Sequence, residues 1–435
     1  MSLFGALNTA VSGLSAQSAA FGNISDNVAN SQTTGYKAVN TNFIDYLTTS
    51  TATNNQPGSV SALPSYTNSV QGTITQSSDP LALAISGQGF FAVSETAGVG
   101  TTGQPTFSAQ TYYTQAGDFQ MNDSAYLVNG AGQYLQGWTV NPQTNVADQS
   151  QLAPIQITQT QFNPVSTLNV ALSANLPATP AANTPVSSQV NVYDALGNAH
   201  VLTLNWTQNS NNDWTVAVSS PDATTPAIGS AEVQFGTASP NGTNAGTIGA
   251  FGTVTGTVTG TAFAANQPAT LSLTTDFGSG SQTININMGE FGQANGVTQF
   301  AGTAYTLRSI SQDGVAPGAF TGISINPSGA VVANYNNGQT ETVAQVPIIT
   351  FSAPDALQRQ NGQAFTATTN SGQAITQAEN TNGAGSLVIG SVESSNVDIA
   401  TQFSDLIIAQ QAYGANAKVV TSANQLLQTT INMIQ

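Results

Sequence analysis

The sequence predicts a mainly β chain with one α-helix at each end. We expect the two helices to pair as an antiparallel coiled coil, with antiparallel β domains nested between them. Apolar residues recur at heptad spacing in about the first 30 and last 30 residues. Residues from about 40 to 395 instead form short β-rich runs separated by Gly, Asn, Pro and Ser. Strands that lack intervening helices favour antiparallel sheets, sandwiches or barrels.

The N-terminal helix is predicted from an apolar residue at every seventh position. These positions are Leu7, Leu14, Phe21 and Val28, and the intervening d positions hold Leu3, Ala10, Gln17 and Ile24. Ser2 is the expected N-cap, and Gly35 in the run TTGYK is the expected stop. Three glycines interrupt the helix at a cost of about 1 kcal/mol each. We therefore expect packing to supply most of its stability.

The C-terminal helix is predicted over residues 403–434 and carries two apolar stripes. The first alternates steps of three and four residues, with Gln410 and Asn424 completing the pattern. Its apolar members are Phe403, Leu406, Tyr413, Ala417, Val420, Leu427, Ile431 and Ile434. The second recurs every seven residues, about 130° round the helix, at Ala412, Val419, Leu426 and Met433. Two stripes predict two partners, whereas an ordinary core helix of a globular domain is the alternative.

The first of these stripes is expected to form an intrachain seam with the N-terminal helix, chiefly with Leu7, Leu14, Phe21, Ile24 and Val28. The chain then divides into nested parts. We expect a terminal helical part (1–35 with 396–435), a connecting segment (36–78 with 355–395), an inner β domain (79–140 with 286–354) and an outer β domain (141–285). The outer part is distinguished by its Pro, Thr and Asn content and by the run GTVTGTVTGTA.

Composition excludes several classes of partner. Four Lys and Arg against twenty Asp and Glu give a net charge of −16, so neither nucleic acid nor an anionic membrane is expected to bind. The absence of cysteine excludes disulfides, thiolate catalysis and zinc–thiolate sites. No run of about 18 apolar residues occurs, so we expect no membrane insertion. The first residues lack the basic and apolar regions of a cleaved signal peptide.

No catalytic, cofactor or metal site is expected. Residues 87–92, GQGFFA, match the GxGxxA dinucleotide fingerprint, but the next residues continue as a strand where that motif needs a helix. His200 is the single histidine, and Asp194 precedes it by six residues. Chain proximity alone does not indicate a catalytic triad, so we interpret His200 as a turn residue in the run DALGNAH. No pair of histidines or cluster of carboxylates has metal-ligand spacing.

Three stretches carry a resemblance to the bacterial flagellar rod and hook proteins. They are ISDNVANSQTTGYKAVNTNF (24–43), VESSNVDIATQFSDLIIAQQAYGANAKVV (392–420) and the internal DPLALAISGQGFFAV with YYTQAGDFQMNDSAYLVNGAGQYLQGW. The run VYDALGNAHVLTLNW (192–206) resembles the outer domain of hook proteins in particular. The matching signature positions are Asn27, Ala29, Asn30, Gly35, Tyr36, Lys37, Ser395, Asn396, Val397, Asp398, Gln410, Tyr413 and Asn416. Gln411 departs from the pattern, since relatives often carry arginine there.

The resemblance implies a structural protein that is not an enzyme. It implies a subunit that polymerises into the flexible, curved tube of the flagellar hook, a universal joint that transmits torque from rod to filament. Implied partners are further copies of the chain, the flagellar rod, the hook cap, the hook–filament junction proteins and the type III export apparatus. The stripe through Ala412, Val419, Leu426 and Met433 then becomes the candidate contact between subunits. The alternatives are a distal rod protein, disfavoured by the large insertion at 141–285, and a β-rich surface protein.

Overall fold

The computed structural model describes residues 3–50, 55–101, 103–141, 144–180 and 184–434. It divides into two compact units. Unit 1 comprises residues 1–159, 322–334 and 340–435, and unit 2 comprises residues 160–321 and 335–339. The predicted class, mainly β with an α-helix at each end, is confirmed.

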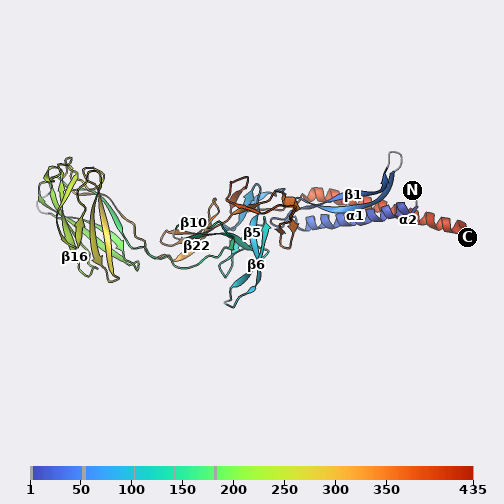
Figure 1. Ribbon diagram of the computed structural model, residues 1–435, viewed down its shortest axis with the longest axis horizontal. Coiled ribbons are helices and arrows are strands. Elements are labelled where there is room, and N and C mark those ends of the chain that lie inside the picture. The colour runs from blue at the N-terminus through green and yellow to red at the C-terminus, as the bar shows by residue number, and fades with distance from the viewer. Residues whose placement is uncertain (1–2, 51–54, 102, 142–143, 181–183, 435) are drawn as a thin grey trace. The chain divides into compact units, whose positions relative to one another are not determined.

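The two helices of unit 1 lie side by side, with a long β-hairpin against the first of them (Figure 1). They are α1 (Leu3–Ala29) and α2 (Ile399–Ile434), and the hairpin consists of β1 (Val39–Ser50) and β2 (Asn55–Tyr66). Three hydrogen bonds fix the hairpin along α1. The Thr9 hydroxyl donates to the Gly58 carbonyl (3.0 Å), the Val60 N–H to the Ser12 hydroxyl (3.1 Å), and the Asn23 amide to the Thr41 hydroxyl (2.8 Å).

The ends of both helices differ from the prediction. α1 stops at Ala29, six residues before Gly35, because the residues from Asn30 to Gly35 form turns. Gly35 has φ +67°, and a Cβ there would come within 2.4 Å of the Ala116 backbone, so glycine is required for a close approach. α2 begins at Ile399, four residues before the predicted start. Ser2 lies outside the described residues.

The β core of unit 1 is one large sheet with smaller pairs beside it. The main strand order is β22 (Phe320–Ile325), β23 (Ala330–Tyr335), β24 (Thr340–Gln345), β9 (Tyr134–Asn141), β5 (Phe91–Val99), β6 (Pro105–Thr114), β27 (Ala364–Thr366) and β26 (Gln358–Arg359). β9 also pairs with β8 (Leu127–Val128), β10 (Val146–Ala147) and β11 (Ala153–Pro154), and β8 pairs with β7 (Gln120–Met121). The separate pairs are β3 (Ile74–Gln76) with β30 (Ser391–Glu393), β4 (Leu83–Ser86) with β29 (Ser386–Ile389), and β25 (Ile348–Thr350) with β28 (Ile375–Gln377). A short 3₁₀ helix, η2, spans Pro354–Ala356.

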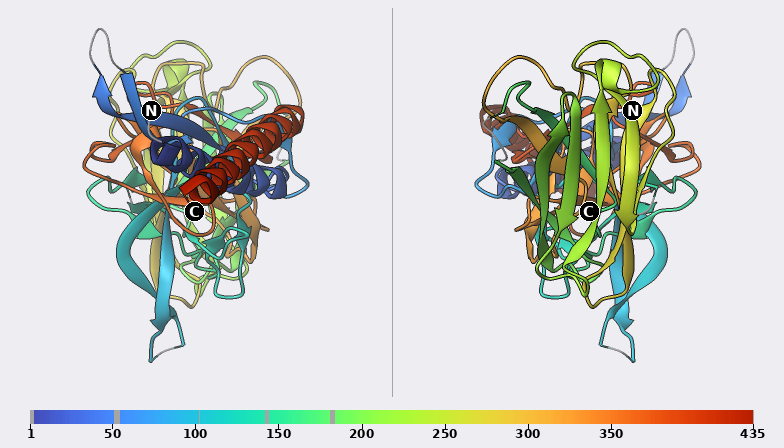
Figure 2. Two further views of the ribbon diagram at one scale, coloured as in Figure 1. Left: turned by 90° about the vertical axis from the view of Figure 1, so that its right-hand side faces the viewer. Right: turned by 90° about the vertical axis from the view of Figure 1, so that its left-hand side faces the viewer.

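Unit 2 consists of two sheets that enclose one core (Figure 2). The first has the order β18 (Val258–Gly260), β19 (Pro268–Asp276), β20 (Ser281–Glu290), β12 (Asn169–Asn175) and β21 (Thr306–Gln312). The second has the order β13 (Val186–Tyr193), β14 (Ala199–Ser210), β15 (Asp213–Ser219), β16 (Ala227–Phe235) and β17 (Ile248–Gly256). A short 3₁₀ helix, η1 (Gly236–Ala238), directly follows β16 in the chain. Alternate residues point inward, among them Trp206 and Trp214, which are fully buried. The expectation of antiparallel pairing has an exception, because β12 and β20 are parallel.

The outer β domain predicted at 141–285 has wrong boundaries at both ends. The strands β10 and β11 follow residue 141 but fold back onto β9 in unit 1, so unit 2 begins only at residue 160. The predicted end at 285 falls inside β20, and β21 still pairs with β12. Both boundaries of the outer β domain follow from which strands pair with each other. The prediction used the Pro, Thr and Asn content, which carries no information on strand pairing.

Candidate assembly site at the terminal helices

The helices α1 and α2 touch along their length and run in opposite directions. The Asn27 amide donates to Gln402 (2.9 Å) near the β core, and the Phe21 and Tyr413 rings meet edge to face at 6.2 Å. Farther along, Gly13 lies so close to Asn416 that a Cβ would come within 2.8 Å of its amide nitrogen. Residue numbers along these contacts increase on α2 while they decrease on α1, so the two helices are antiparallel.

The face of α2 turned to α1 differs from the predicted seam by one residue at every second position. It comprises Gln402, Leu406, Ala409, Tyr413, Asn416, Val420, Ala423 and Leu427. Leu406, Tyr413, Val420 and Leu427 were predicted, and they alternate with residues that directly precede the predicted Phe403, Gln410, Ala417 and Asn424. Phe403 is 52% exposed and Ile431 is 55% exposed, so placing them in the seam is wrong. The side chain of Ile434 lies outside the described part of the structure.

Small side chains explain the shift. On α1 the buried positions of this region include Ala10, Gly13, Ala16 and Ala20, and on α2 they include Ala409 and Ala423. These small residues let the helix backbones approach closely, as at Gly13 and Asn416. The buried positions of α2 include Gln402, Ala409 and Ala423, whereas Phe403 is exposed. Of the predicted α1 seam, Ile24 is buried, whereas Leu7, Leu14, Phe21 and Val28 are only partly buried. Phe and Ile are more hydrophobic than Ala and Gly, so a prediction based on hydrophobicity selected the larger residues for the seam and not the small ones that are buried in it.

Replacing Gly13 by alanine should stabilise the assembled helices less than replacing Gly22 by alanine. Alanine gains about 1 kcal/mol over glycine inside a helix. Gly22 has no atom within 4 Å of a built Cβ and should show the full gain, whereas at Gly13 the Asn416 side chain must first move. The midpoint of thermal melting, followed by far-ultraviolet circular dichroism of the polymer, measures both. Equal gains would show that the two helices are not in close contact at Gly13.

Asn27 is the centre of a buried polar network where the helices join the β core. Its amide nitrogen donates to the Val39 carbonyl (3.0 Å) as well as to Gln402, and its oxygen accepts from the Val39 N–H (2.9 Å) and the Tyr36 hydroxyl (3.2 Å). All four hydrogen-bonding positions of the amide are therefore used, as a buried amide requires. The Tyr36 ring lies under the Arg359 guanidinium at 4.3 Å.

Lys37 and Glu393 form a buried ion pair beside this network. Their side chains are each 1% exposed and lie 2.5 Å apart. The ammonium also donates to the Val70 carbonyl (2.8 Å), and the same carboxylate oxygen accepts the Gly72 N–H (2.7 Å). Burial lowers the pKa of Lys37, and the carboxylate of Glu393 opposes that change. The ion pair thus connects the loop after α1 to β30, the strand that precedes α2.

Asn396 and Asp398 complete the junction at the start of α2. Asn396 accepts the Ala38 N–H (2.7 Å), and its amide nitrogen lies within hydrogen-bond distance of the Thr67 and Val70 carbonyls (3.3 and 3.1 Å). Asp398 is the N-cap of α2, accepting the Ala400 N–H at 2.9 Å. Hydrogen bonds from the Thr401 hydroxyl and from the Thr401 and Ala400 backbone lower the pKa of Asp398.

The remaining signature residues either form hydrogen bonds with residues near in sequence or are exposed to solvent. Asn30 donates to the Asp26 carbonyl and Ser395 accepts the Val397 N–H, both close in sequence. Ala29 and Gln410 are exposed, as is Gln411. Sequence reasoning missed Glu393, Arg359 and Gln402. In a chain with 6% charged residues, the position of Glu393 within the resembling stretch 392–420 was an available signal.

The second predicted stripe lies on a side of α2 that α1 does not cover. Val419, Leu426 and Met433 are 46%, 57% and 76% exposed, and Ala412 is partly buried. Ile408, which the prediction omitted, is exposed near the same side. Such apolar residues on one helix are typical of a surface that another molecule covers.

The motifs considered for catalysis have structural roles here. Gly87 and Gly89 have positive φ angles, and the next residues form β5, so no helix opens toward a phosphate. His200 starts the returning strand of the β13–β14 hairpin, stacks on Phe277 at 4.3 Å and lies 3.5 Å from Asp194 and from Asp222. Within the described residues no group of His, Asp and Glu could hold a metal ion. Among the same residues no helix combines the length and apolar character needed to cross a membrane.

Four family models match the chain. "Flagella basal body rod protein" matches residues 7–37, and "Flagellar basal body rod FlgEFG protein C-terminal" matches residues 389–433. "Flagellar hook protein FlgE/F/G D1 domain" matches residues 84–173, and "Flagellar basal body protein FlaE D2 domain" matches residues 166–315. The two terminal matches contain Asn27, Lys37, Glu393 and Asn396, the residues of the junction.

The flagellar hook protein FlgE of Brucella abortus is 31% identical to this chain over 440 residues, covering 100% of both. The chain belongs to the flagellar hook protein family. The FlgE of Salmonella typhimurium is 28% identical over 445 residues and covers 98% of each chain. A solved hook protein, FlgE2 of Helicobacter pylori, has a TM-score of 0.49 at 15% identity, over 74% of this chain and 100% of that one.

Membership of the hook protein family makes the chain a structural component of the bacterial flagellum, within a polymer of hook subunits. The alternative of a distal rod protein is not favoured, since the full-length relatives are hook proteins. The D2 match over residues 166–315 lies within unit 2, the insertion that distinguished the hook from the rod in the sequence.

Proposed function

We propose that many copies of this chain polymerise through their terminal helices into a flexible, curved tube that transmits torque from rod to filament. One observation carries the proposal: α2 buries one side on α1 and leaves large apolar side chains exposed on its other sides. A monomer would keep these side chains in water, whereas a polymer buries them, at about 25 cal/mol per Å² of apolar surface.

The proposal includes the finer organisation of the subunit. α1 and α2 form an antiparallel coiled coil with a small-residue seam at the inner wall of the tube. The connecting segment (36–78 with 355–395) and the inner β domain are inserted between the two helices, and the outer β domain is inserted in the inner one. The polymer surface offers neutral amide and hydroxyl groups, whose contacts exchange more readily than desolvated ion pairs as the tube bends.

The proposal also covers location and partners. The subunit leaves the cell through the type III export apparatus, and it meets the rod, the hook cap and the hook–filament junction proteins. It binds no cofactor, nucleic acid or membrane, and it is not an enzyme. Electron microscopy of the purified, concentrated chain tests the central point. Curved tubes of uniform width are expected, and straight rods or flat sheets would contradict the proposal.

Removing about 30 residues from each end should give a soluble chain that keeps its β structure and forms no tubes. The reason is that α1 and α2 hold the exposed apolar side chains, while both β cores are built from the residues between them. Far-ultraviolet circular dichroism and electron microscopy measure the two properties on one sample. Tubes formed by the truncated chain would place the assembly contacts in the β domains instead.

A further inference from the structure

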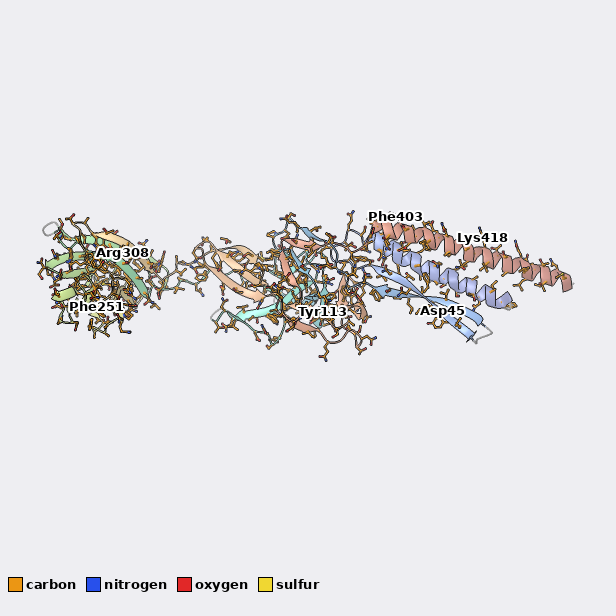
Figure 3. The ribbon with its side chains drawn as sticks, turned by 90° about the horizontal axis from the view of Figure 1, so that it is seen from above. Asp45, Tyr113, Phe251, Arg308, Phe403 and Lys418 are labelled. Carbon is orange, nitrogen blue, oxygen red and sulfur yellow. The ribbon has the colours of Figure 1, made fainter. Side chains whose placement is uncertain are left out.

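One side of α2 presents a bulky apolar patch and a single cation. Ile399, Phe403 and Ile407 are exposed, and Lys418 follows on the same side about three turns after Ile407. Figure 3 shows Phe403 and Lys418 along the edge of α2 that faces away from α1 and the hairpin. No carboxylate lies within ion-pair distance of Lys418 among the described residues. Neither α1 nor the hairpin therefore covers this patch.

The opposite side of the helix pair is hollow at the same height. A groove of about 230 Å³ runs between α1, β1 and α2. Its apolar lining includes Ala20 and Ile24 from α1, Phe43 from β1, and Ile408 and Ala409 from α2. Phe43 and Ile408 are both exposed at its rim. Because the groove spans α2 from Gln402 to Ala409, it lies level with Phe403 and Ile407 on the other side.

Asp45 lies farther along β1, beyond the residues that line the groove. It follows Phe43 by two residues, so both side chains are on one face of β1. Asp45 pairs with Val60, which is hydrogen-bonded to Ser12, and the next residue, Gly13, touches Asn416. Asp45 therefore lies at the height of Lys418, across α1 from it. Figure 3 shows the two residues on opposite edges of the helical region.

We infer that a second copy of this chain docks its α2 into this groove, with Phe403 and Ile407 filling the apolar part and Lys418 pairing with Asp45. The inference rests on the proposed polymerisation. Two independent features match without any axial offset between the copies: apolar bulk meets the apolar part of the groove, whose lining also holds Gln402 and Asp405, and the exposed cation meets the Asp45 carboxylate. Each copy uses two different surfaces, and such a heterologous contact generates rings or open helical assemblies.

Cross-linking between introduced cysteines tests the contact directly, because the chain has no cysteine of its own. The double variant Asp45→Cys/Lys418→Cys is polymerised and treated with a short bismaleimide. A heterologous contact is expected to give a ladder of dimers, trimers and larger species on a denaturing gel. Each single variant should give monomers, since one cysteine per copy would then face no second cysteine.

The matched control is Asp45→Cys/Asn432→Cys, with the second thiol exposed on the same side but 14 residues farther along, about 21 Å. A ladder from the first pair and none from the control supports the contact. Tubes that give no ladder with Asp45→Cys/Lys418→Cys, or an equal ladder with the control, would overturn it while leaving polymerisation intact. If the unmodified chain forms no tubes, the proposed function fails and the contact fails with it.

If the cysteine variant does not assemble, exchanging the charges of Asp45 and Lys418 tests whether the two residues pair. Asp45→Lys and Lys418→Asp each place like charges opposite each other, so each should raise the critical concentration for polymerisation roughly fivefold or more. The double variant Asp45→Lys/Lys418→Asp restores opposite charges and should return it toward the original value. A double variant that polymerises no better than the single ones would contradict the pairing.

Discussion

The variant Val419→Asp/Leu426→Asp is expected to remain monomeric at concentrations where the unmodified chain forms tubes. Both side chains are about half exposed in the subunit, so the substitutions should cost the monomer little. Burying each in a polymer would contribute about 1.5–3 kcal/mol, and a buried, unpaired carboxylate would cost several kcal/mol more. Sedimentation velocity gives the mass, and circular dichroism checks that the β domains stay folded.

The matched control is Thr421→Asp/Gln428→Asp. These residues are also exposed on α2 and also seven apart, but they lie about 160° round the helix from Val419 and Leu426. The control adds the same two charges to the same helix, and it should still form tubes, with at most a small rise in critical concentration. Equal loss of assembly in both variants would mean that net charge, and not the apolar stripe, controls polymerisation.

The substitution Glu393→Gln should destabilise unit 1 by about 3–5 kcal/mol, because it leaves the buried Lys37 ammonium without its counter-charge. Hydrogen exchange measures the effect locally. The amides of residues 35–39, 70–76 and 391–396 should lose protection, while those of unit 2 serve as an internal reference. The control Glu379→Gln removes a half-buried carboxylate of the same unit, whose side-chain partner is the adjacent Asn380, and it should change protection little.

Replacing both partners, as Lys37→Met/Glu393→Met, should recover part of the loss, since two apolar side chains do not leave an isolated charge. A double variant as unstable as Glu393→Gln would instead assign the stability to the hydrogen bonds of Glu393 with Gly72 and Lys37. Protection unchanged in Glu393→Gln would show that the ion pair does not hold the junction together.

The sequence by itself determined the fold class and the presence of both helices. Their heptad periodicity is a local property, since residues three and four apart meet on one face of any helix. The β-rich runs of the middle were likewise predicted from short segments. The stripe of Val419, Leu426 and Met433 lies outside the α1 contact, as the spacing indicated, and its contact with other subunits stays a prediction.

Only the tertiary structure decided which residues of α2 meet α1. Small residues are buried in this contact, Gly13, Ala16 and Ala20 on α1 and Ala409 and Ala423 on α2, whereas Phe403 is exposed. Close packing of two surfaces depends on both at once, so neither helix's own pattern contains it. The same holds for Lys37 and Glu393, 356 positions apart, whose burial as a pair depends on three segments arriving together.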